Sequence, residues 1–512
     1  MSGSLAVMAS AVVVGVDGLP VSVEVHSGNG LPSFTIVGLP DASCREARDR
    51  VRAAILSSGL RWPDRRVTVN LAPSDVRKIG TGLDLPIALC VLAANKDVPD
   101  FGPEHLTGLG AIGELGLDGS LRPVHGLVSM ADAVDCRDLL VPAERAEHAA
   151  IIKPDRVRAS ATLREVFDGL TGATPLPVLV DPPAAVAAAP STTDLCEVLG
   201  QPMARLAVEV AAAGGHHLLI VGSPGSGKTM LAERMVGLLP DLEPDDALAA
   251  TKIHSVAAQD LPPGGLVRRP PYRAPHHGAS AVALIGGGTS RILPGEISLA
   301  SGGVLFLDEL GEFPVIVLEA LRQPLEEGVV RISRASASAT MPARFQLIAA
   351  MNPCPCGEGA TEAGCRCSDA ARARYARRLS GPLLDRFDLR IEVAPAHNSA
   401  LMGDGPAEES TAQVADRVAA ARLLARERGV RTNADLPSRR LDEVAPLVPE
   451  ARRLVERALE AGELSARGLR RVRTVARTIA DLQDGRKHID PDALCVALSL
   501  RTRPFSVLGA TA

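Results

Sequence analysis

The segment LLIVGSPGSGKTMLAERM, residues 218–235, decides the fold of this chain. It begins with a short apolar run, continues through three closely spaced glycines, and ends in apolar residues spaced as on one face of a helix. The loop at 222–229 has the spacing G-x-x-x-x-G-K-T, which is typical of a phosphate-binding turn between a strand and a helix. Because the flanking patterns fit this context, we expect a nucleotide-binding α/β fold and not a chance glycine-rich turn.

The loop supplies the expected phosphate ligands, which are Gly222, Ser223, Pro224, Gly225, Ser226, Gly227, Lys228 and Thr229. Its glycines allow backbone N–H groups to turn inward around phosphate oxygens, and the helix N-terminus adds partial positive charge. Lys228 can reach the β- and γ-phosphates of ATP, and Thr229 can ligate Mg²⁺. The sequence therefore predicts ATP and Mg²⁺ as ligands.

An acidic pair, Asp308 and Glu309, follows a second apolar run at Val304–Leu307. In this setting Asp308 would hold Mg²⁺ through water, and Glu309 would orient and polarise the attacking water. A glutamate directly after the metal aspartate indicates hydrolysis rather than nucleotide binding alone. An acidic strand end exposed to solvent is the alternative, because apolar runs that end in Asp-Glu are common.

The chain has 512 residues, which predicts two to four domains. A linker rich in proline and alanine at 173–193 separates the segment 1–172 from the segment 194–394. In the latter, short apolar runs alternate with helical patterns, which predicts a parallel sheet covered on both faces. From 395 to 512 the chain predicts a small helical domain. One helical face there holds Val472, Val475, Ala476, Ile479 and Leu482.

Composition excludes several classes of protein. The net charge of −5 argues against a basic coat protein for nucleic acid, although a local basic channel remains compatible with it. Aromatic residues make up only 2%, so a binding surface of stacked bases is not expected. The N-terminus lacks the basic segment of a signal peptide, and no apolar stretch reaches the ~20 residues that span a bilayer. We therefore expect a cytoplasmic protein without membrane contact.

Four long stretches carry a resemblance to the ComM/YifB family, the magnesium-chelatase-like AAA+ proteins. They are PYRAPHHGASAVALIGGGTSRILPGEISLASGGVLFLDELGEF (271–313), AAMNPCPCG (349–357), LLDRFDL (383–389) and LSARGLRRVRTVARTIADL (464–482). The resemblance extends over essentially the whole chain. It implies an α/β AAA+ P-loop ATPase core with a parallel sheet, preceded by a Lon-protease-type α+β domain and followed by a helical lid.

The same resemblance implies roles for residues outside the phosphate loop. Val198, Gly200 and Gln201 resemble the segment that packs near adenine. Asn352 follows the expected strand Phe345–Ala350 and matches the sensor asparagine, which senses the γ-phosphate or positions water.

Arginines near the C-terminal half resemble the catalytic arginines of the family. Arg386 resembles the finger that reaches a neighbouring subunit's ATP. Arg467 resembles the lid arginine that touches the phosphate of its own subunit, and Arg471 is its rival. A finger acting in trans implies a ring, most often a homo-hexamer. The six arginines at 372–390 indicate a subunit interface, with a solvated helix as the alternative.

Four of the nine cysteines are clustered as C-x-C-x₈-C-x-C: Cys354, Cys356, Cys365 and Cys367. Four thiolates suit a closed tetrahedral Zn²⁺ site without an open catalytic position. A redox pair or unliganded thiols are the alternatives, because the pairs are shorter than the usual C-x₂-C. Asn352 lies two residues before the cluster, so we hypothesise that the metal fixes the strand end that carries the sensor.

Residues 268–296 form an insertion with a Gly-Gly-Gly run and His276-His277. A glycine-rich hairpin with basic flanks can project into a ring pore, which Arg331 and Arg334 can also face, following a nucleic-acid backbone without reading bases. For the two histidines we favour a structural or pore role over metal binding, because no partner at ligand spacing is evident.

The N-terminal segment carries two stretches that resemble a Lon-type protease domain, KIGTGLDLPIAL (78–89) and GELGLDGSLRPVHGL (113–127). The positions of the catalytic serine and lysine fall on Gly82 and Val128, which can act as neither nucleophile nor base. We therefore expect the fold without the protease.

Taken together, these features predict an ATP-hydrolysing hexameric motor that translocates on DNA. The family resemblance implies helicase-type branch migration during natural transformation, with single-stranded or branched DNA and recombination proteins as partners. The alternative is a chelatase-type ATPase that remodels a protein. A protease is disfavoured by Gly82 and Val128, and a switch without motor action is disfavoured by Glu309 and Arg386.

Overall fold

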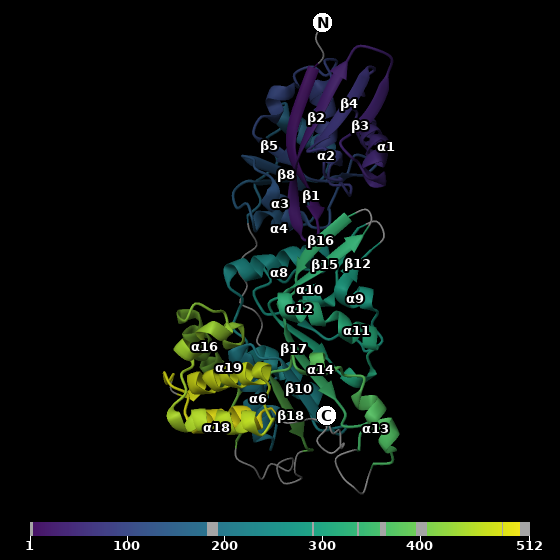
Figure 1. Cartoon of the computed structure of the whole chain (residues 1–512). Coiled ribbons are helices and arrows are strands. Elements are labelled where there is room, and N and C mark those ends of the chain that lie inside the picture. The colour runs from purple at the N-terminus through teal and green to yellow at the C-terminus, as the bar shows by residue number, and fades with distance from the viewer. Residues whose placement is uncertain are drawn as a thin grey trace.

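The computed structural model describes residues 4–181, 193–288, 291–334, 337–358, 365–395, 407–483 and 485–501. They form an N-terminal part up to residue 181, a central part from 193 to 395, and a C-terminal helical part from 407 (Figure 1). Much of both expected breaks, at 173–193 and after 395, lies outside the described residues. In the described parts of the chain, no helix combines the length and the apolar composition needed to cross a bilayer.

A mixed seven-stranded sheet with the order β3-β4-β2-β1-β5-β8-β9 forms the centre of the N-terminal part. Its strands and the small ladder β6–β7 are β1 Ser4–Val14, β2 Asp17–Gly28, β3 Ser33–Val37, β4 Arg66–Ala72, β5 Leu109–Ala111, β6 Glu114–Leu115, β7 Leu121–Arg122, β8 Asp138–Pro142 and β9 Val157–Ser160. The helices are α1 Ala42–Ser57, α2 Asp84–Ala94, α3 Leu127–Ala133, α4 Ala146–Ala150 and α5 Leu163–Leu170. The first described residues of the chain form strand β1.

Helix α2 is buried along its whole length, because its sequence DLPIALCVLAA is apolar on every side. It begins just after Gly82, where the catalytic serine of a Lon-type protease would lie. A Cβ atom on Gly82 would come within 2.7 Å of Met130 Cε, and Val128 on the same helix as Met130 is fully buried. Apolar side chains therefore surround the two positions at which the sequence predicts a lost serine–lysine dyad.

The central part contains a five-stranded sheet with the order β11-β14-β17-β10-β18, in which every pairing is parallel. Its strands and hairpins are β10 Leu218–Gly222, β11 Tyr272–Arg273, β12 Gly286–Gly287, β13 Leu293–Pro294, β14 Val304–Leu307, β15 Val329–Arg334, β16 Ala337–Pro342, β17 Gln346–Met351 and β18 Leu389–Val393. The helices are α6 Pro202–Gly214, α7 Lys228–Met235, α8 Pro244–Val256, α9 Ala281–Ile285, α10 Glu296–Leu299, α11 Val315–Ala320, α12 Arg322–Glu327, α13 Asp369–Ala376 and α14 Gly381–Leu384.

The three apolar runs expected as strands all lie in this sheet, and two edge strands join them. Leu389–Val393, which begins at the end of the arginine-rich run 372–390, pairs with β10 as strand β18. Tyr272–Arg273 is too short to show any periodicity, and it pairs with β14. Both edge strands are therefore stabilised by their neighbours in the sheet rather than marked by local sequence.

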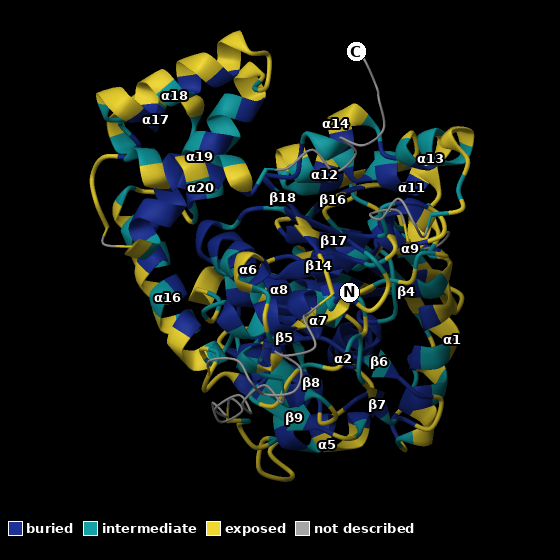
Figure 2. Cartoon of the chain, turned by 90° about the horizontal axis from the view of Figure 1, so that it is seen from below, coloured by how far each residue is buried: buried dark blue, intermediate teal, exposed yellow. Residues whose placement is uncertain are grey.

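Both faces of this sheet are covered, as expected for a parallel sheet. Leu218 and Ile220 of β10 pack into one apolar cluster, whereas Leu219 and Val221 pack into another on the opposite face. Figure 2 shows β14 and β17, two strands of this sheet, in the dark blue of buried residues near the middle of the molecule.

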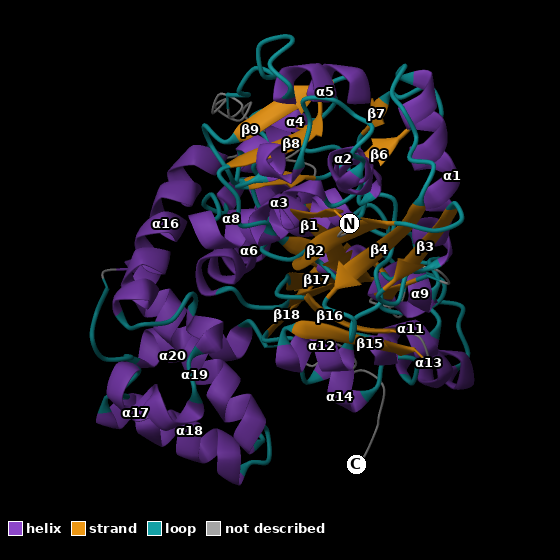
Figure 3. Ribbon diagram, turned by 90° about the horizontal axis from the view of Figure 1, so that it is seen from above, coloured by secondary structure: helices purple, strands orange, loops and turns teal. Residues whose placement is uncertain are grey.

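The C-terminal part consists of helices: α16 Thr411–Glu427, α17 Leu441–Val444, α18 Pro449–Glu460, α19 Ala466–Gln483 and α20 Pro491–Ser499. They lie together at one side of the molecule, without strands among them in the described residues (Figure 3). Val472, Val475, Ala476 and Ile479 of α19 are buried, which confirms the expected apolar face. These side chains share one apolar cluster with α6 and β10, so the helical part packs directly on the central sheet.

The N-terminal part contacts the central part through helices α3 and α8. The backbone N–H of Gly126 donates to Ser255 O at 3.0 Å, and Lys252 Nζ lies 2.6 Å from Asp132 Oδ2. The β15–β16 hairpin lies against the same region, because a Cβ atom on Gly15 would come within 3.3 Å of Ala339 Cβ. Figure 1 shows this hairpin at the junction between the two parts.

Candidate nucleotide-binding site

The phosphate loop connects the carboxyl end of β10 to the first residue of α7, as the sequence predicts. Gly225 and Gly227 adopt positive φ angles of 76° and 84°. These angles favour glycine, because an L side chain is strained in the left-handed region. Loop N–H groups and the start of an eight-residue helix are thus presented at one edge of the sheet.

Lys228 is almost fully buried beneath the loop. Its ammonium donates to the carbonyl oxygens of Gly222 at 2.9 Å and Ser223 at 2.8 Å, and to Asn352 Oδ1 at 3.2 Å. Burial lowers the pKa of Lys228, whereas the carboxylates of Asp308 and Glu309 act to raise it. The structure thus brings Lys228 and Asn352 into direct contact, although 124 residues separate them.

The acidic pair lies next to the loop, at the carboxyl end of β14. Thr229 Oγ1 donates to Asp308 Oδ2 at 2.7 Å, and the backbone N–H of Glu309 donates to Asp308 Oδ1 at 2.8 Å. A hydroxyl and a carboxylate in contact are hard oxygen ligands of the kind that Mg²⁺ binds together with substrate phosphates. The donor set of Thr229 and Asp308 therefore fits this ion.

A residue outside the expected catalytic set, His277, contacts Glu309. Its Nδ1 lies 3.0 Å from Glu309 Oε2. The ring stacks near His276 and meets the edge of Phe313, with ring centroids 4.0 and 6.5 Å away. His277 follows strand β11, and because β11 pairs with β14 in parallel, both strands end at the same edge of the sheet. The sequence alone did not indicate that β11 pairs with β14, so it gave no sign that His277 contacts Glu309.

Gln201, expected near adenine, lies against the phosphate loop. Its Nε2 donates to Ser226 O at 2.9 Å and to Ala394 O at 3.2 Å, so the side chain bridges the loop and the end of β18. Its buried Oε1 has no hydrogen-bond partner among the described residues and is free to accept from a ligand. Val198 is buried close by in the chain and contributes to the central core.

The arginines implicated by the family pattern lie at the opposite edge of the sheet. A groove of 990 Å³ between the central and helical parts is lined by Arg386, Arg467 and Arg471, and by residues that precede β10, β14 and β17. The phosphate loop follows the carboxyl end of β10, so the groove opens at the other ends of the strands. The contact of Arg467 with the phosphate of its own subunit therefore does not fit this arrangement.

The three arginines of the groove, Arg386, Arg467 and Arg471, differ in burial and in the groups that they contact. Arg386 is largely buried and pairs with Glu326 at 2.5 Å. Arg471 pairs with buried Asp388 and donates to Arg386 O at 2.8 Å. Arg467 is exposed in the same groove. Arg471 thus ties α19 to the sheet, whereas Arg467 presents its guanidinium to solvent.

The four clustered cysteines bring their sulfur atoms together, with all four Sγ atoms within 4.8 Å of one another. Cys354 Sγ lies 3.2 Å from Cys356 Sγ and 3.8 Å from Cys365 Sγ. The backbone N–H of Glu358 lowers the pKa of Cys356 to about 6, while burial raises the pKa of Cys354 to about 12. The set can hold a metal, which agrees with the expectation from spacing.

The insertion contains the expected hairpin only as a short ladder, Gly286–Gly287 with Leu293–Pro294. Arg331, expected to face a pore, pairs with Glu327 on the preceding helix. The side chain of Arg334 lies outside the described residues.

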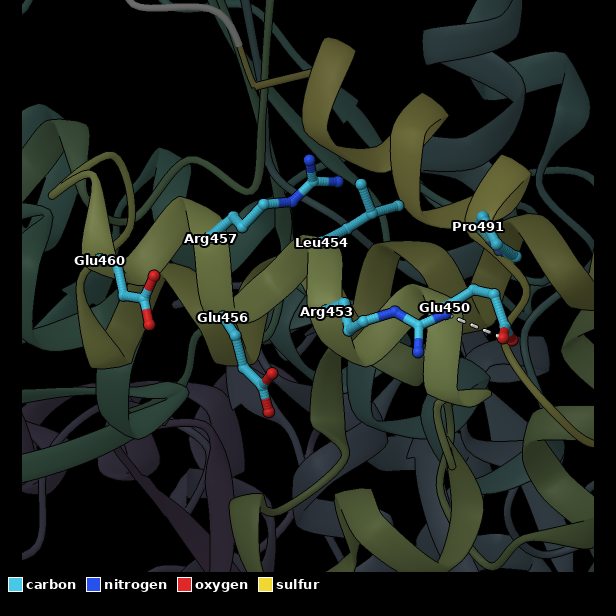
Figure 4. A pocket seen from close by; sticks show the side chains of 7 residues that line it. All are labelled: Glu450, Arg453, Leu454, Glu456, Arg457, Glu460 and Pro491. Carbon is cyan, nitrogen blue, oxygen red and sulfur yellow. Dashed lines mark hydrogen bonds and ion pairs between the residues drawn. The ribbon is translucent and has the colours of Figure 1, made fainter.

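A separate hollow of 630 Å³ lies on the outer face of α18, lined by Glu450, Arg453, Leu454, Glu456, Arg457, Glu460 and Pro491 (Figure 4). Its charged side chains alternate in sign along the helix, and Arg453 pairs with Glu450 at 3.0 Å. Figure 4 shows these groups spread along the helix and not converging on one point, which is typical of a solvated helix face.

Comparisons with known proteins match each part of the chain. The family model "Magnesium chelatase, subunit ChlI" matches residues 194–401, "Subunit ChlI of Mg-chelatase" matches 23–145, and "Magnesium chelatase, subunit ChlI C-terminal" matches 408–501. Competence protein ComM of Haemophilus influenzae is 43% identical over 97% of this chain and 97% of its own length. Uncharacterized protein YifB of Salmonella typhimurium is 42% identical over 94% of each chain.

A shorter similarity concerns a Lon protease. Archaeal Lon protease of Archaeoglobus fulgidus is 46% identical over 52 residues, which are 10% of this chain and 8% of its own length.

Proposed function

The chain belongs to the ComM/YifB family of magnesium-chelatase-like proteins, and from this premise we propose that it is an ATP-hydrolysing AAA+ motor that acts on DNA. The observation that carries the proposal is the convergence of Lys228, Thr229, Asp308, Glu309 and Asn352 at one edge of the parallel sheet. These side chains come from three strand ends that are far apart in the sequence.

Each group in this site has a distinct task in ATP hydrolysis. Mg²⁺ held by Thr229 and Asp308 supplies positive charge to the phosphates. Lys228, held by loop carbonyls, exchanges these contacts for phosphate oxygens when ATP binds. Asn352, in contact with Lys228, is placed to sense the γ-phosphate, and Glu309 orients the attacking water.

We extend the proposal to a ring, most simply a homo-hexamer, in which each site is completed by a neighbour. Arg386 and Arg467 line a groove at the far edge of the sheet from their own phosphate loop. Guanidinium groups placed there can serve ATP only in a second subunit. Arg467 is exposed in this arrangement, and Arg386 becomes free only if its pair with Glu326 opens.

DNA is the proposed substrate because a relative that matches this chain over 97% of its own length is a competence protein. The task we propose is helicase-type branch migration of incoming DNA in the cytoplasm during natural transformation, alongside recombination proteins. Because only 2% of the residues are aromatic, we expect the protein to bind the DNA strand through arginine and backbone contacts with phosphate. Binding should then be blind to sequence and sensitive to salt.

The deciding experiment is ATP turnover of the purified chain with and without single-stranded or branched DNA. Lys228→Ala, which removes the buried phosphate-binding ammonium, and Glu309→Gln serve as controls. The proposal is supported if DNA stimulates ATP turnover in the unmodified protein but not in either variant. Absence of both stimulation and DNA binding at low salt contradicts it.

A chelatase-type ATPase that remodels a protein partner is the second candidate, favoured by three family models that all name subunit ChlI. ATP turnover that is indifferent to DNA, together with tight binding to a protein partner, would favour this candidate instead.

Two further properties accompany the proposal. We assign Zn²⁺ to the four clustered cysteines, because soft thiolates in a compact set favour it. We also propose that the N-terminal part is a scaffold without protease activity, since Gly82 and Val128 occupy the positions of the dyad. A casein-degradation assay should show no ATP-dependent cleavage.

A further inference from the structure

The cysteine cluster is wedged against the nucleotide site, and we propose that its metal braces the phosphate loop, so that Zn²⁺ and nucleotide strengthen each other's binding. The inference rests on the nucleotide-binding part of the proposed function and is independent of DNA. Two features carry it: the geometry of the four sulfur atoms and the contacts of the segment that bears them.

The sulfur atoms have the spacing of a tetrahedral site. A Zn–S bond of about 2.3 Å in a regular tetrahedron separates sulfurs by about 3.8 Å. Cys365 Sγ lies 3.8 Å from both Cys354 Sγ and Cys356 Sγ, these two lie closer together at 3.2 Å, and the whole set lies within 4.8 Å. The site thus needs little rearrangement to take one Zn²⁺, and four thiolates leave no position for substrate.

Gly357, the residue after the first pair of cysteines, packs against the phosphate loop. Gly357 follows Cys356, adopts a φ of 85°, and turns back through a hydrogen bond from its N–H to Cys354 O at 3.0 Å. A Cβ atom on Gly357 would come within 2.8 Å of both Cγ and Cδ of Pro224. The backbone of the cluster is therefore packed on the ring of a loop proline with no room for a side chain.

The segment also contacts the other two strand ends of the site. Asn352, the partner of Lys228, lies two residues before Cys354. Helix α13, which begins soon after Cys367, places Tyr375 over Gly311, where a Cβ atom would lie 2.5 Å from the tyrosine hydroxyl. Gly311 follows Glu309 by two residues, so one metal-ordered segment touches the phosphate loop, the sensor asparagine and the acidic strand end.

Metal binding orders such a segment because the four thiolates tie the Cys354–Cys356 turn to Cys365 and Cys367, which lead into α13. Without Zn²⁺, the cysteine segment would no longer hold Pro224 and Asn352 in place. Nucleotide binding would then have to order both residues, which weakens the affinity for nucleotide. By thermodynamic linkage the effect is reciprocal, so bound nucleotide should slow the loss of Zn²⁺.

The test follows zinc and nucleotide in the full chain. Elemental analysis should find about one Zn²⁺ and no iron per chain. Transfer of Zn²⁺ to a chromophoric chelator should slow at least about fivefold when MgADP saturates the protein. Metal-free protein should bind a fluorescent ADP about tenfold more weakly, with recovery after Zn²⁺ is restored.

Three variants locate the coupling. Cys365→Ser should lose both Zn²⁺ and nucleotide affinity, whereas Cys495→Ser, at an exposed cysteine on α20, should lose neither. Pro224→Ala keeps the four thiols but removes the ring against Gly357, so ADP should no longer protect Zn²⁺.

Equal zinc release with and without ADP in the unmodified protein would overturn the inference, even if Cys365→Ser does not fold. Protection that persists in Pro224→Ala would overturn the bracing contact. Because no step involves DNA, a protein that fails to respond to DNA can still pass this test.

Discussion

The imidazole of His277 holds the carboxylate of Glu309, with Nδ1 3.0 Å from Oε2. His277 follows β11, which lies on the side of β14 that faces away from β17 and β10. The contact therefore links the carboxylate to the segment that follows an edge strand of the sheet. Glu309 also adopts a positive φ of 51°, an unusual conformation for a glutamate, so both its backbone and its side chain are held.

Replacing His277 with alanine should raise basal ATP turnover. The carboxylate must leave the imidazole before it can orient water, and a hydrogen bond of about 1 kcal/mol corresponds to roughly a fivefold change. Stimulation by DNA should shrink accordingly. His276→Ala is the matched control, because the Nδ1 of His276 accepts from Gly278 N instead. Unchanged turnover in His277→Ala would show that this contact does not restrain hydrolysis.

Glu309→Gln should abolish turnover while nucleotide binding persists. The amide cannot accept a proton or polarise water, so a loss of about 10²- to 10⁴-fold is expected. The contact between Thr229 and Asp308 does not involve Glu309 and should be retained. Steady-state turnover and fluorescent-nucleotide titration measure the two effects, and near-normal turnover would remove Glu309 from the mechanism.

Arg471→Ala should destabilise the protein, whereas Arg467→Ala should not. Burial acts to raise the pKa of Asp388, but Arg471 outweighs it and holds that pKa well below its usual range. Removing Arg471 would leave a buried carboxylate without its arginine, with the backbone N–H of His217 and the ring of His216 as its remaining partners, at a cost of about 3 kcal/mol. Exposed Arg467 makes no such pair, so Arg467→Ala should unfold like the unmodified chain and lose only ATP turnover. Thermal unfolding compares the two variants, and equal midpoints would contradict the assignment.

Stability should fall as the pH drops from about 6.5 towards 4, in part because of His217. Burial lowers the pKa of His217 to about 4, against the opposing effect of Asp388. The backbone N–H of Leu347 donates to its Nδ1 at 3.0 Å, which requires the neutral ring. Below pH 6.5 the unfolded chain binds a proton at His217 that the folded chain does not. The free energy of unfolding therefore falls as the pH drops.

His217→Gln is the test of this assignment, because glutamine keeps an acceptor without titrating. Its unfolding midpoint should depend less on pH between 7.5 and 5 than that of the unmodified protein. An identical dependence would place the titration on another group.

Much of the nucleotide-binding site could be predicted from the sequence because the motifs that form it are continuous in the chain. The spacing of the glycines in the phosphate loop reflects backbone angles that few other residues adopt, and Asp308 and Glu309 directly follow an apolar strand. The clustering of the four cysteines was visible for the same reason, since all lie within fourteen residues. In each case neighbours in the chain are also neighbours in space.

Other features of the site follow from the order of the strands and from packing between segments that are distant in the chain. The pairing of β11 with β14 brings His277 to Glu309, and the two-residue strand that does this carries no pattern of its own. The position of the helical part puts Arg467 at the far edge of the sheet and commits Arg471 to Asp388, although both arginines belong to one helix. Local periodicity determines which residues form a strand or a helix, but long-range burial determines what each end of it faces.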